Sequence, residues 1–318
     1  MLSNLESIAR FVTIVEEGTM RRAAERRGVT QAALTRSLKL LEDSVGAALF
    51  DRRARGLHLT QMGHEVLQQA RHLLREVQLS EAEIRARHAG ERGLLRLSAA
   101  PVWLWSVIPS ILPQVHKTYP GLTFELTAQN YEEAIPLLKN GECDAFFGGF
   151  QKVEPLPSFL VRTPMFTARL AVAARKSHPL MQQDQVTLHD LLNCNWISFQ
   201  NDVAYLDTLN AIIHRQTGET IKAAIHCDSM LPALELLRHG NYVSLLPSNF
   251  VNHLYGDGVG ILSLNIDDIS FQSGPIYRRG LNSNSAFKLL LDLAQKRVSD
   301  LGLEDPYLPD NLSRPQTT

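Results

Sequence analysis

Two short helical patterns separated by a tight turn most constrain the fold of the first 63 residues. Apolar residues at helical spacing predict a first helix from about residue 4 to 16, before Gly18. Thr19 is suited to cap a second helix that ends at Gly28, and Thr30 is suited to cap a third. The third helix has one apolar face, made by Leu34, Leu38, Leu41 and Val45. The stretch therefore predicts a small helical domain built on a helix-turn-helix.

The opposite face of the third predicted helix carries residue types that can read DNA. It displays Ala32, Thr35, Arg36 and Lys39, with Gln31 in the first turn. Arginine can pair bidentately with guanine and glutamine with adenine, while threonine and alanine methyl groups can touch a thymine methyl. A lysine there is suited to a phosphate. We predict that all five residues contact DNA; the alternative is an ordinary solvated helix face.

An arginine-rich ribbon follows the third helix. In the run LFDRRARGLHLT (residues 49–60), Arg52, Arg53 and Arg55 surround a predicted turn between extended flanks. A winged helix-turn-helix uses such a ribbon to contact the DNA backbone and the minor groove. The sequence thus predicts a winged helix-turn-helix head over residues 1–63.

The head resembles a known family. The runs AAERRGVTQAALTR (23–36), LFDR (49–52) and LTQMG (59–63) strongly resemble the head of LysR-type transcriptional regulators. The resemblance implies a set of major-groove residues and one minor-groove arginine: Gln31, Ala32, Thr35 and Arg36, and then Arg53 or Arg55. Three residues depart from the usual family pattern, where Ala32 replaces Pro, Thr35 replaces Ser and Arg27 replaces a core Leu.

Charge is distributed unevenly along the 318 residues. The whole chain has a formal net charge of −1, whereas residues 1–64 hold ten Lys and Arg against seven Asp and Glu, a balance of +3 that leaves −4 for the remainder. A modestly basic head on a slightly acidic body fits site-specific DNA binding. The sequence has no apolar run of about 18 residues and begins with an amphipathic pattern, so we expect a soluble cytoplasmic protein without a membrane partner.

Cysteine usage and catalytic motifs argue against several function classes. Cys143, Cys194 and Cys227 do not have the spacing of a metal cluster and are predicted to be small core residues; an oxidant sensor is the alternative. The sequence has no GxGxxG, no GxSxG and no P-loop. We therefore predict no cofactor, no metal and no enzymatic activity.

A long helix is predicted to follow the head, over residues 64–90. Its apolar residues recur in a rhythm of three and four: Leu67, Ala70, Leu74, Val77 and Ile84. We interpret this stripe as a coiled-coil seam in a dimerisation helix, which would hold two heads at the spacing of a two-fold operator. The alternative is a helix that packs against its own chain.

Strands and helices alternate from residue 91 to 302. A βαβαβ pattern ends near Phe150, a second set of strands and helices follows Pro164, and a final helix is predicted near 286–298. Together with the landmarks YPG (119–121), GECD (141–144) and LLP (245–247), this pattern resembles the periplasmic-binding-protein-like domain of the same regulators. The predicted fold class is α/β, with lobe I over about 91–164 and 268–302 and lobe II over about 165–267. The polar tail, 303–318, is predicted to be disordered.

A ligand of such a domain is expected at the carboxyl ends of the strands. The predicted effector residues are hydrogen-bonding groups, aromatic covers and one proline at these ends: Asn130, Ser198, Gln200, Ser229, Trp103, Phe199 and Pro101. Pro101 stands where many relatives have a Ser or Thr for a carboxylate.

These features favour a DNA-binding transcriptional regulator whose C-terminal domain binds a small-molecule effector. The predicted partners are operator DNA, the effector, a second copy of the chain (a homodimer or a dimer of dimers) and RNA polymerase. Two alternatives stay open: an enzyme or small-molecule-binding α/β protein with an accessory DNA-binding head, and a solute-binding or architectural protein without regulatory coupling.

Overall fold

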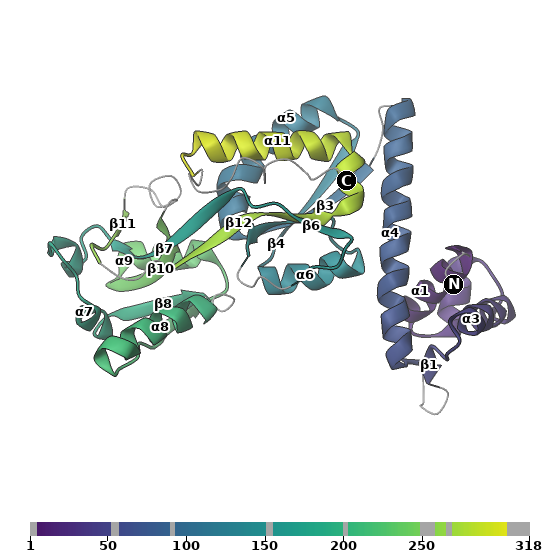
Figure 1. Cartoon of the computed structure of the whole chain (residues 1–318), viewed down its shortest axis with the longest axis horizontal. Helices are drawn as coiled ribbons and strands as arrows, with labels where there is room; N and C mark the ends of the chain where they lie inside the picture. The colour runs from purple at the N-terminus through teal and green to yellow at the C-terminus, as the bar shows by residue number, and fades with distance from the viewer. Residues whose placement is uncertain are drawn as a thin grey trace.

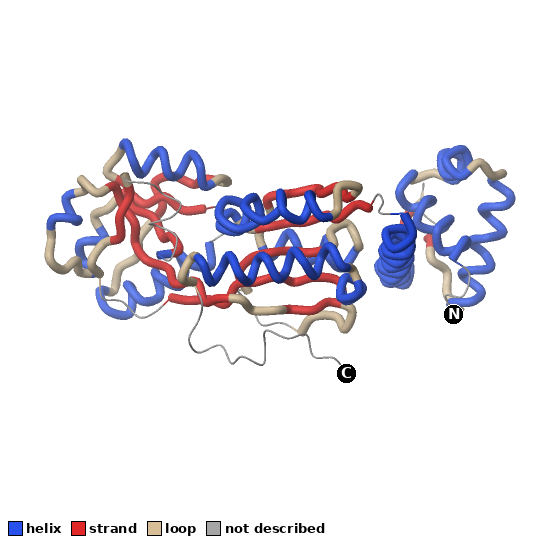
Figure 2. The backbone as a smooth tube through the Cα atoms, turned by 90° about the horizontal axis from the view of Figure 1, so that it is seen from above, coloured by secondary structure: helices blue, strands red, loops and turns tan. Residues whose placement is uncertain are grey.

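Three parts follow one another along the chain: a helical head, one long helix and an α/β domain (Figure 1). The computed structural model describes residues 5–51, 57–89, 93–150, 155–199, 203–248, 258–264 and 269–303. The head and the α/β domain lie on opposite sides of the long helix, as the view from above also shows (Figure 2).

The head is a helix-turn-helix with a short two-stranded ribbon. Its elements are α1 (Leu5–Glu17), α2 (Met20–Arg27), α3 (Gln31–Val45), β1 (Phe50–Asp51) and β2 (His58–Leu59). The Thr19 hydroxyl accepts from the backbone N–H of Arg22, and the Thr30 hydroxyl accepts from that of Ala33. Gly28 ends α2 with φ 63°, a left-handed conformation that glycine adopts without strain. Both predicted caps and the predicted turn are confirmed.

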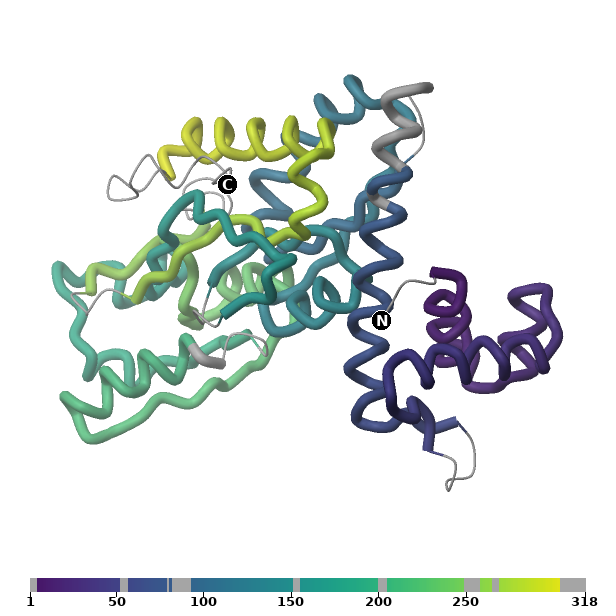
Figure 3. The backbone as a smooth tube through the Cα atoms, turned by 45° about the vertical axis from the view of Figure 1, so that its right-hand side comes forward, coloured from purple at the N-terminus to yellow at the C-terminus, as the bar shows by residue number. Residues whose placement is uncertain are grey.

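The long helix α4 (Gln61–Ala89) begins inside the core of the head. Leu67 and Ala70 are 8% and 0% exposed and pack with the α1 residues Ile8 and Phe11, and Figure 3 shows the early part of α4 running beside the head. The prediction that Leu67 and Ala70 belong to a seam between two chains is therefore wrong. The apolar stripe packs against the head of the same chain instead. An apolar helix face can pack against its own chain or against a second chain, so the pattern alone does not distinguish the two. The side chain of Ile84, which is predicted to belong to the same seam, lies outside the described part of the structure.

The α/β domain contains one continuous sheet of ten described strands, in the order β4-β3-β5-β12-β7-β10-β8-β9, with β6 beside β12 and β11 beside β7. The strands are β3 (Gly93–Ala99), β4 (Leu122–Ala128), β5 (Ala145–Gly149), β6 (Leu160–Arg162), β7 (Phe166–Arg175), β8 (Asn195–Phe199), β9 (Ala223–Cys227), β10 (Tyr242–Pro247), β11 (Val259–Ile261) and β12 (Ile269–Arg278). Strands β4, β3 and β5 are parallel to one another, as are β10, β8 and β9.

The two halves of the sheet are joined by the long strands β7 and β12, which pair antiparallel. The first part of β12 pairs with β7 and its second part pairs with β5, while the second part of β7 pairs with β10. Each long strand is thus shared by both lobes. The predicted alternation of strands and helices is confirmed, and the sheet continues from one lobe into the other.

Helices cover both faces of the sheet. They are α5 (Ile108–Thr118), α6 (Tyr131–Asn140), α7 (Leu188–Leu192), α8 (Val203–Thr217), α9 (Met230–His239) and α11 (Ser285–Asp300). In the first lobe α5 and α11 lie together on one face and α6 lies on the other (Figure 1).

Two further features concern the ends of elements in this domain. The helical segment after β3 begins as a π-helical turn, Trp103–Val107, and becomes α-helical at Ile108, where Pro109 occupies the first turn. Leu303 is 3% exposed and packs on the core, so the ordered body includes this first residue of the predicted tail. The rest of the predicted tail lies outside the described residues.

Candidate functional site

The predicted DNA-reading residues share one exposed face of α3. Gln31, Ala32, Thr35, Arg36 and Lys39 are all exposed. Leu34 and Leu41 on the other side are 0% and 3% exposed. The Thr35 hydroxyl donates to the carbonyl of Gln31 at 2.9 Å, which directs its methyl group away from that carbonyl. Arg53 and Arg55 of the ribbon lie outside the described residues.

Two buried polar contacts fix how α3 sits in the head. Ser37 Oγ donates to Ser7 Oγ of α1 at 3.1 Å, and the carboxylate of Glu42 accepts from the backbone N–H of Leu49 at 2.8 Å. Glu42 is only 8% exposed. It therefore ties the end of α3 to the start of the ribbon, a role that the sequence did not indicate.

Arg27, at a position where the resemblance implies a core leucine, sits in an unusual setting. Its Nε and Nη2 atoms are buried, and the described part of the chain offers them no hydrogen-bond partner. Burying polar N–H groups without acceptors costs free energy. Arg27 is therefore a source of instability within the head.

A cavity of about 160 Å³ opens where the two lobes of the α/β domain meet. Its walls come from the carboxyl ends of β3, β4, β8, β9 and β10, and its floor from the crossing strands, through Phe166, Ala168 and Leu170 of β7 and Phe271 and Ser273 of β12. Alternate residues of a strand point to one face, so these five side chains line one surface. This is where ligands bind in open α/β sheets.

Four of the predicted effector residues line this cavity, namely Pro101, Trp103, Asn130 and Phe199. Ser198 instead lines a smaller void beside it, and its hydroxyl lies 2.8 Å from Nδ1 of His226. Ser229 is exposed and is not among the described lining residues. Gln200 lies outside the described residues.

The cavity wall is largely aromatic, and several of its polar groups form hydrogen bonds within the protein. Trp103 Nε1 donates to Ser273 Oγ at 2.9 Å, and Trp103 lies 5.5 Å from the ring of Phe166. Tyr205 stacks on Phe271 with 5.1 Å between ring centroids. The sequence reasoning missed Tyr205, Phe271 and Asp228. Asp228 directly follows the end of β9, a position that could have indicated it, whereas the two rings meet only in the folded chain.

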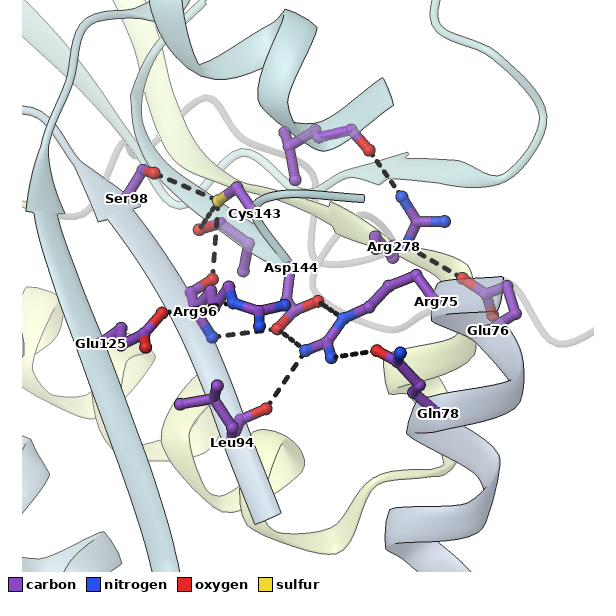
Figure 4. A network of polar contacts seen from close by, with 12 residues as sticks. Arg75, Glu76, Gln78, Leu94, Arg96, Ser98, Glu125, Cys143, Asp144 and Arg278 are labelled. Atoms are coloured by element: carbon purple, nitrogen blue, oxygen red, sulfur yellow. Dashed lines mark hydrogen bonds and ion pairs between the residues drawn. The ribbon is translucent and has the colours of Figure 1, made fainter. Parts of the chain in front are cut away.

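The helix α4 is joined to the α/β domain by a buried ion pair (Figure 4). Arg75 donates through Nε to Asp144 Oδ1 at 2.6 Å and through Nη2 to the second carboxylate oxygen. The side chain of Asp144 is 0% exposed and also accepts from the backbone N–H of Arg96 at 2.9 Å. Because Arg75 also donates to the carbonyl of Leu94 at 3.2 Å, the linker helix is held directly against β3.

A second group of contacts lies beside the first. Arg278, at the end of β12, donates to Glu76 Oε1 at 3.0 Å and to the carbonyl of Leu138 at 2.6 Å, and it also contacts Nδ1 of His72. The imidazole of His72 stacks on Phe159 with 3.9 Å between ring centroids. Burial and the neighbouring guanidinium of Arg278 lower the pKa of His72 to about 4. We call His72, Arg75, Glu76, Asp144 and Arg278 the linker contact.

The described residues hold no group of three or more His, Cys, Asp or Glu arranged to bind a metal ion. The cysteines Cys143, Cys194 and Cys227 are free, and burial raises the pKa of each thiol. No described helix is long and apolar enough to cross a membrane.

A helix-turn-helix head, a linker helix and a two-lobed α/β domain with a cavity at its joint define a ligand-responsive DNA-binding regulator. The chain belongs to the LysR family: the model "Bacterial regulatory helix-turn-helix protein, lysR family" matches residues 5–64, and "LysR substrate binding domain" matches residues 88–299. It is a DNA-binding transcriptional regulator with an effector-binding domain.

Individual relatives agree with this assignment. The transcriptional regulator ClcR of Pseudomonas putida is 32% identical over 239 residues, which cover 74% of this chain and 80% of ClcR. Full-length OxyR from Pseudomonas aeruginosa has a similar structure, with a TM-score of 0.69 at 20% identity over 97% of this chain and 100% of that one. CbnR complexed with its target DNA gives a TM-score of 0.57 at 20% identity over 92% and 99%.

Proposed function

We propose that this regulator reads its operator with the exposed face of α3 and senses its effector in the cavity between the lobes. Gln31, Ala32, Thr35 and Arg36 would contact base edges in the major groove, Lys39 a phosphate, and Arg53 or Arg55 the minor groove. The observation that carries the proposal is that α3 has two distinct faces: the predicted reading residues on this helix are exposed, while Leu34 and Leu41 on the opposite face are buried.

The effector site rests on the position of the cavity. It lies at the carboxyl ends of parallel strands from both lobes and includes Pro101, Trp103, Asn130 and Phe199. Ser198, Gln200 and Ser229 belong to the same strand ends and remain proposed effector contacts. A bound effector would shift the protein toward the conformation that it binds best.

The regulator is further proposed to act in the cytoplasm as a homodimer or a dimer of dimers, with RNA polymerase as a further partner and without enzymatic activity. Paired helix-turn-helix heads read two half-sites about one helical turn apart. The naming of its relatives as transcriptional regulators supports a non-enzymatic role.

Operator binding by two single variants tests the reading face. Arg36→Ala is expected to remove one bidentate base contact, worth about 1–3 kcal/mol of discrimination, and so to lower the preference for operator over random DNA. Lys39→Ala is expected to weaken binding to all sequences and to reduce the salt dependence by about one ion.

Arg215→Ala, at an exposed arginine of α8, serves as the matched control and should bind as the wild type does. Unchanged operator preference in Arg36→Ala, measured by fluorescence anisotropy against both DNAs, would show that α3 does not read the operator through this residue.

A further inference from the structure

We propose that the cavity selects a compact, single-ring aromatic ligand that carries an amine and no acidic group. This inference rests on the proposed effector site and specifies what the site accepts. A volume of about 160 Å³ suits a single ring, since a cavity of about 150 Å³ accommodates a benzene-sized molecule.

The charges around the cavity disfavour an anion. Its described lining residues include the carboxylates of Glu133 and Asp228 and include no Lys, Arg or His. A carboxylate ligand would lose its hydration there without gaining an ion-pair partner, and it would be repelled by both acidic groups.

Several of the hydrogen-bonding groups beside the cavity are already paired within the chain. At the start of α6, the Asn130 side chain accepts from the N–H of Glu133 at 2.9 Å, and the Glu133 carboxylate accepts from the N–H of Asn130 at 3.1 Å. The chain's own carboxylate thus occupies part of this helix end and adds negative charge there.

The same holds on the neighbouring strand end. The backbone N–H groups of Trp103 and Leu104 both donate to the carbonyl of Ala100, at 3.0 and 3.1 Å, and the indole N–H of Trp103 donates to Ser273. Pro101 contributes neither a side-chain hydroxyl nor a backbone N–H.

A protonated amine matches the aromatic and acidic groups of the cavity lining. The cavity lining includes the aromatic side chains of Trp103, Phe166, Phe199 and Phe271, and aromatic rings attract both cations and other aromatic rings. Asp228 is an exposed carboxylate at the rim and can pair with an ammonium group while the ring stays inside. The polar end of the ligand is therefore expected to face the start of α9.

Three probes of similar size separate the alternatives: phenethylamine, phenylacetamide and phenylacetate, titrated calorimetrically into the full chain. We expect phenethylamine to bind tightest and phenylacetate at least about tenfold more weakly than phenethylamine. Asp228→Asn should remove the advantage of the amine over the amide, and Asp228→Lys should make phenylacetate the preferred probe. Since Asp228 is exposed, neither change is expected to disturb folding.

Phenylacetate binding as tightly as phenethylamine, or no binding by any probe, would overturn the inference. A cavity-filling change, Ala168→Leu, distinguishes this failure from failure of the proposed site. If phenylacetate binds and Ala168→Leu abolishes that binding, the site is correct and the ligand class is wrong. If a probe binds equally to wild type and to Ala168→Leu with an unchanged melting temperature, the cavity is not the effector site.

Discussion

Arg75 of the linker helix and Asp144 of the effector domain form an ion pair that is buried on both sides, with side chains 8% and 0% exposed. The two residues are 69 positions apart, and the carboxylate also accepts from the backbone of β3. This pair therefore fixes the orientation of α4 relative to the effector domain of the same chain.

Breaking the pair should loosen the linker helix. Asp144→Asn or Arg75→Ala leaves a buried charge without its partner, and such losses cost about 3–5 kcal/mol. Thermal unfolding and hydrogen exchange of α4 and β3 measure the effect. Arg71→Ala is the matched control one turn earlier, because Arg71 pairs with Glu142 near the surface at 3.5 Å and should cost about 0–1 kcal/mol. Equal effects of Arg71→Ala and Arg75→Ala would contradict this reasoning.

His72 should make the linker contact sensitive to acid. Its pKa of about 4 in the folded chain lies below the value near 6.5 in the unfolded chain, so the unfolded state binds more protons between these two pH values. This contribution to the free energy of unfolding is complete above about pH 6.5 and is lost as the pH falls toward 4. The full shift corresponds to about 3.4 kcal/mol, and partial exposure of the imidazole reduces this to on the order of 2 kcal/mol.

His72→Gln keeps an acceptor for Arg278 and removes the titration, so its stability should fall less than that of the wild type between pH 6.5 and 4. Denaturant unfolding at a series of pH values measures the difference. His64→Gln, at an exposed position of the same helix, is the control and should keep the wild-type slope. An identical slope in His72→Gln would rule out His72 as the titrating group.

Replacing Arg27 should stabilise the head. Arg27→Leu removes two buried guanidinium nitrogens that have no hydrogen-bond partner among the described residues, and it adds apolar surface to the core, which should gain about 1–3 kcal/mol. Hydrogen exchange in α1 to α3 of the full chain reports the gain locally. The control is Arg26→Leu, whose arginine is exposed and pairs with Glu16 and Glu17, so little change or a slight loss is expected. Faster exchange in Arg27→Leu would mean that the guanidinium has a stabilising partner in solution.

The hydrogen bond between Trp103 and Ser273 should help to hold the floor of the cavity. Ser273→Ala leaves the buried indole N–H without its acceptor, at a cost of about 1–3 kcal/mol. Trp103→Phe alone and the double variant complete a mutant cycle. If the hydrogen bond is responsible, Ser273→Ala will be less harmful in the Trp103→Phe background, and strictly additive losses would show that it contributes nothing.

Local chemistry explains what the sequence could predict. The caps at Thr19 and Thr30 and the turn at Gly28 depend on residues three or four positions apart, so their patterns are visible in the chain. The alternation of strands and helices is equally local, and it predicts an effector cavity at the strand ends that includes Trp103 and Phe199.

Long-range geometry explains what the sequence could not predict. The partners in the linker contact are separated by up to 206 positions, and no local pattern marks them. The apolar stripe through Leu67 and Ala70 looks the same whether it meets another chain or its own head. Ser198 and Phe199 are adjacent on β8, and adjacent side chains of a strand point to opposite faces of the sheet. The two side chains therefore could not both face the cavity.

The strand β12 connects the cavity of the effector domain directly to the linker helix. Ser273 in the cavity floor and Arg278 in the linker contact are five residues apart on this one extended strand, a span of about 17 Å. An effector bound in the proposed cavity would therefore contact the same strand that holds α4 through Arg278.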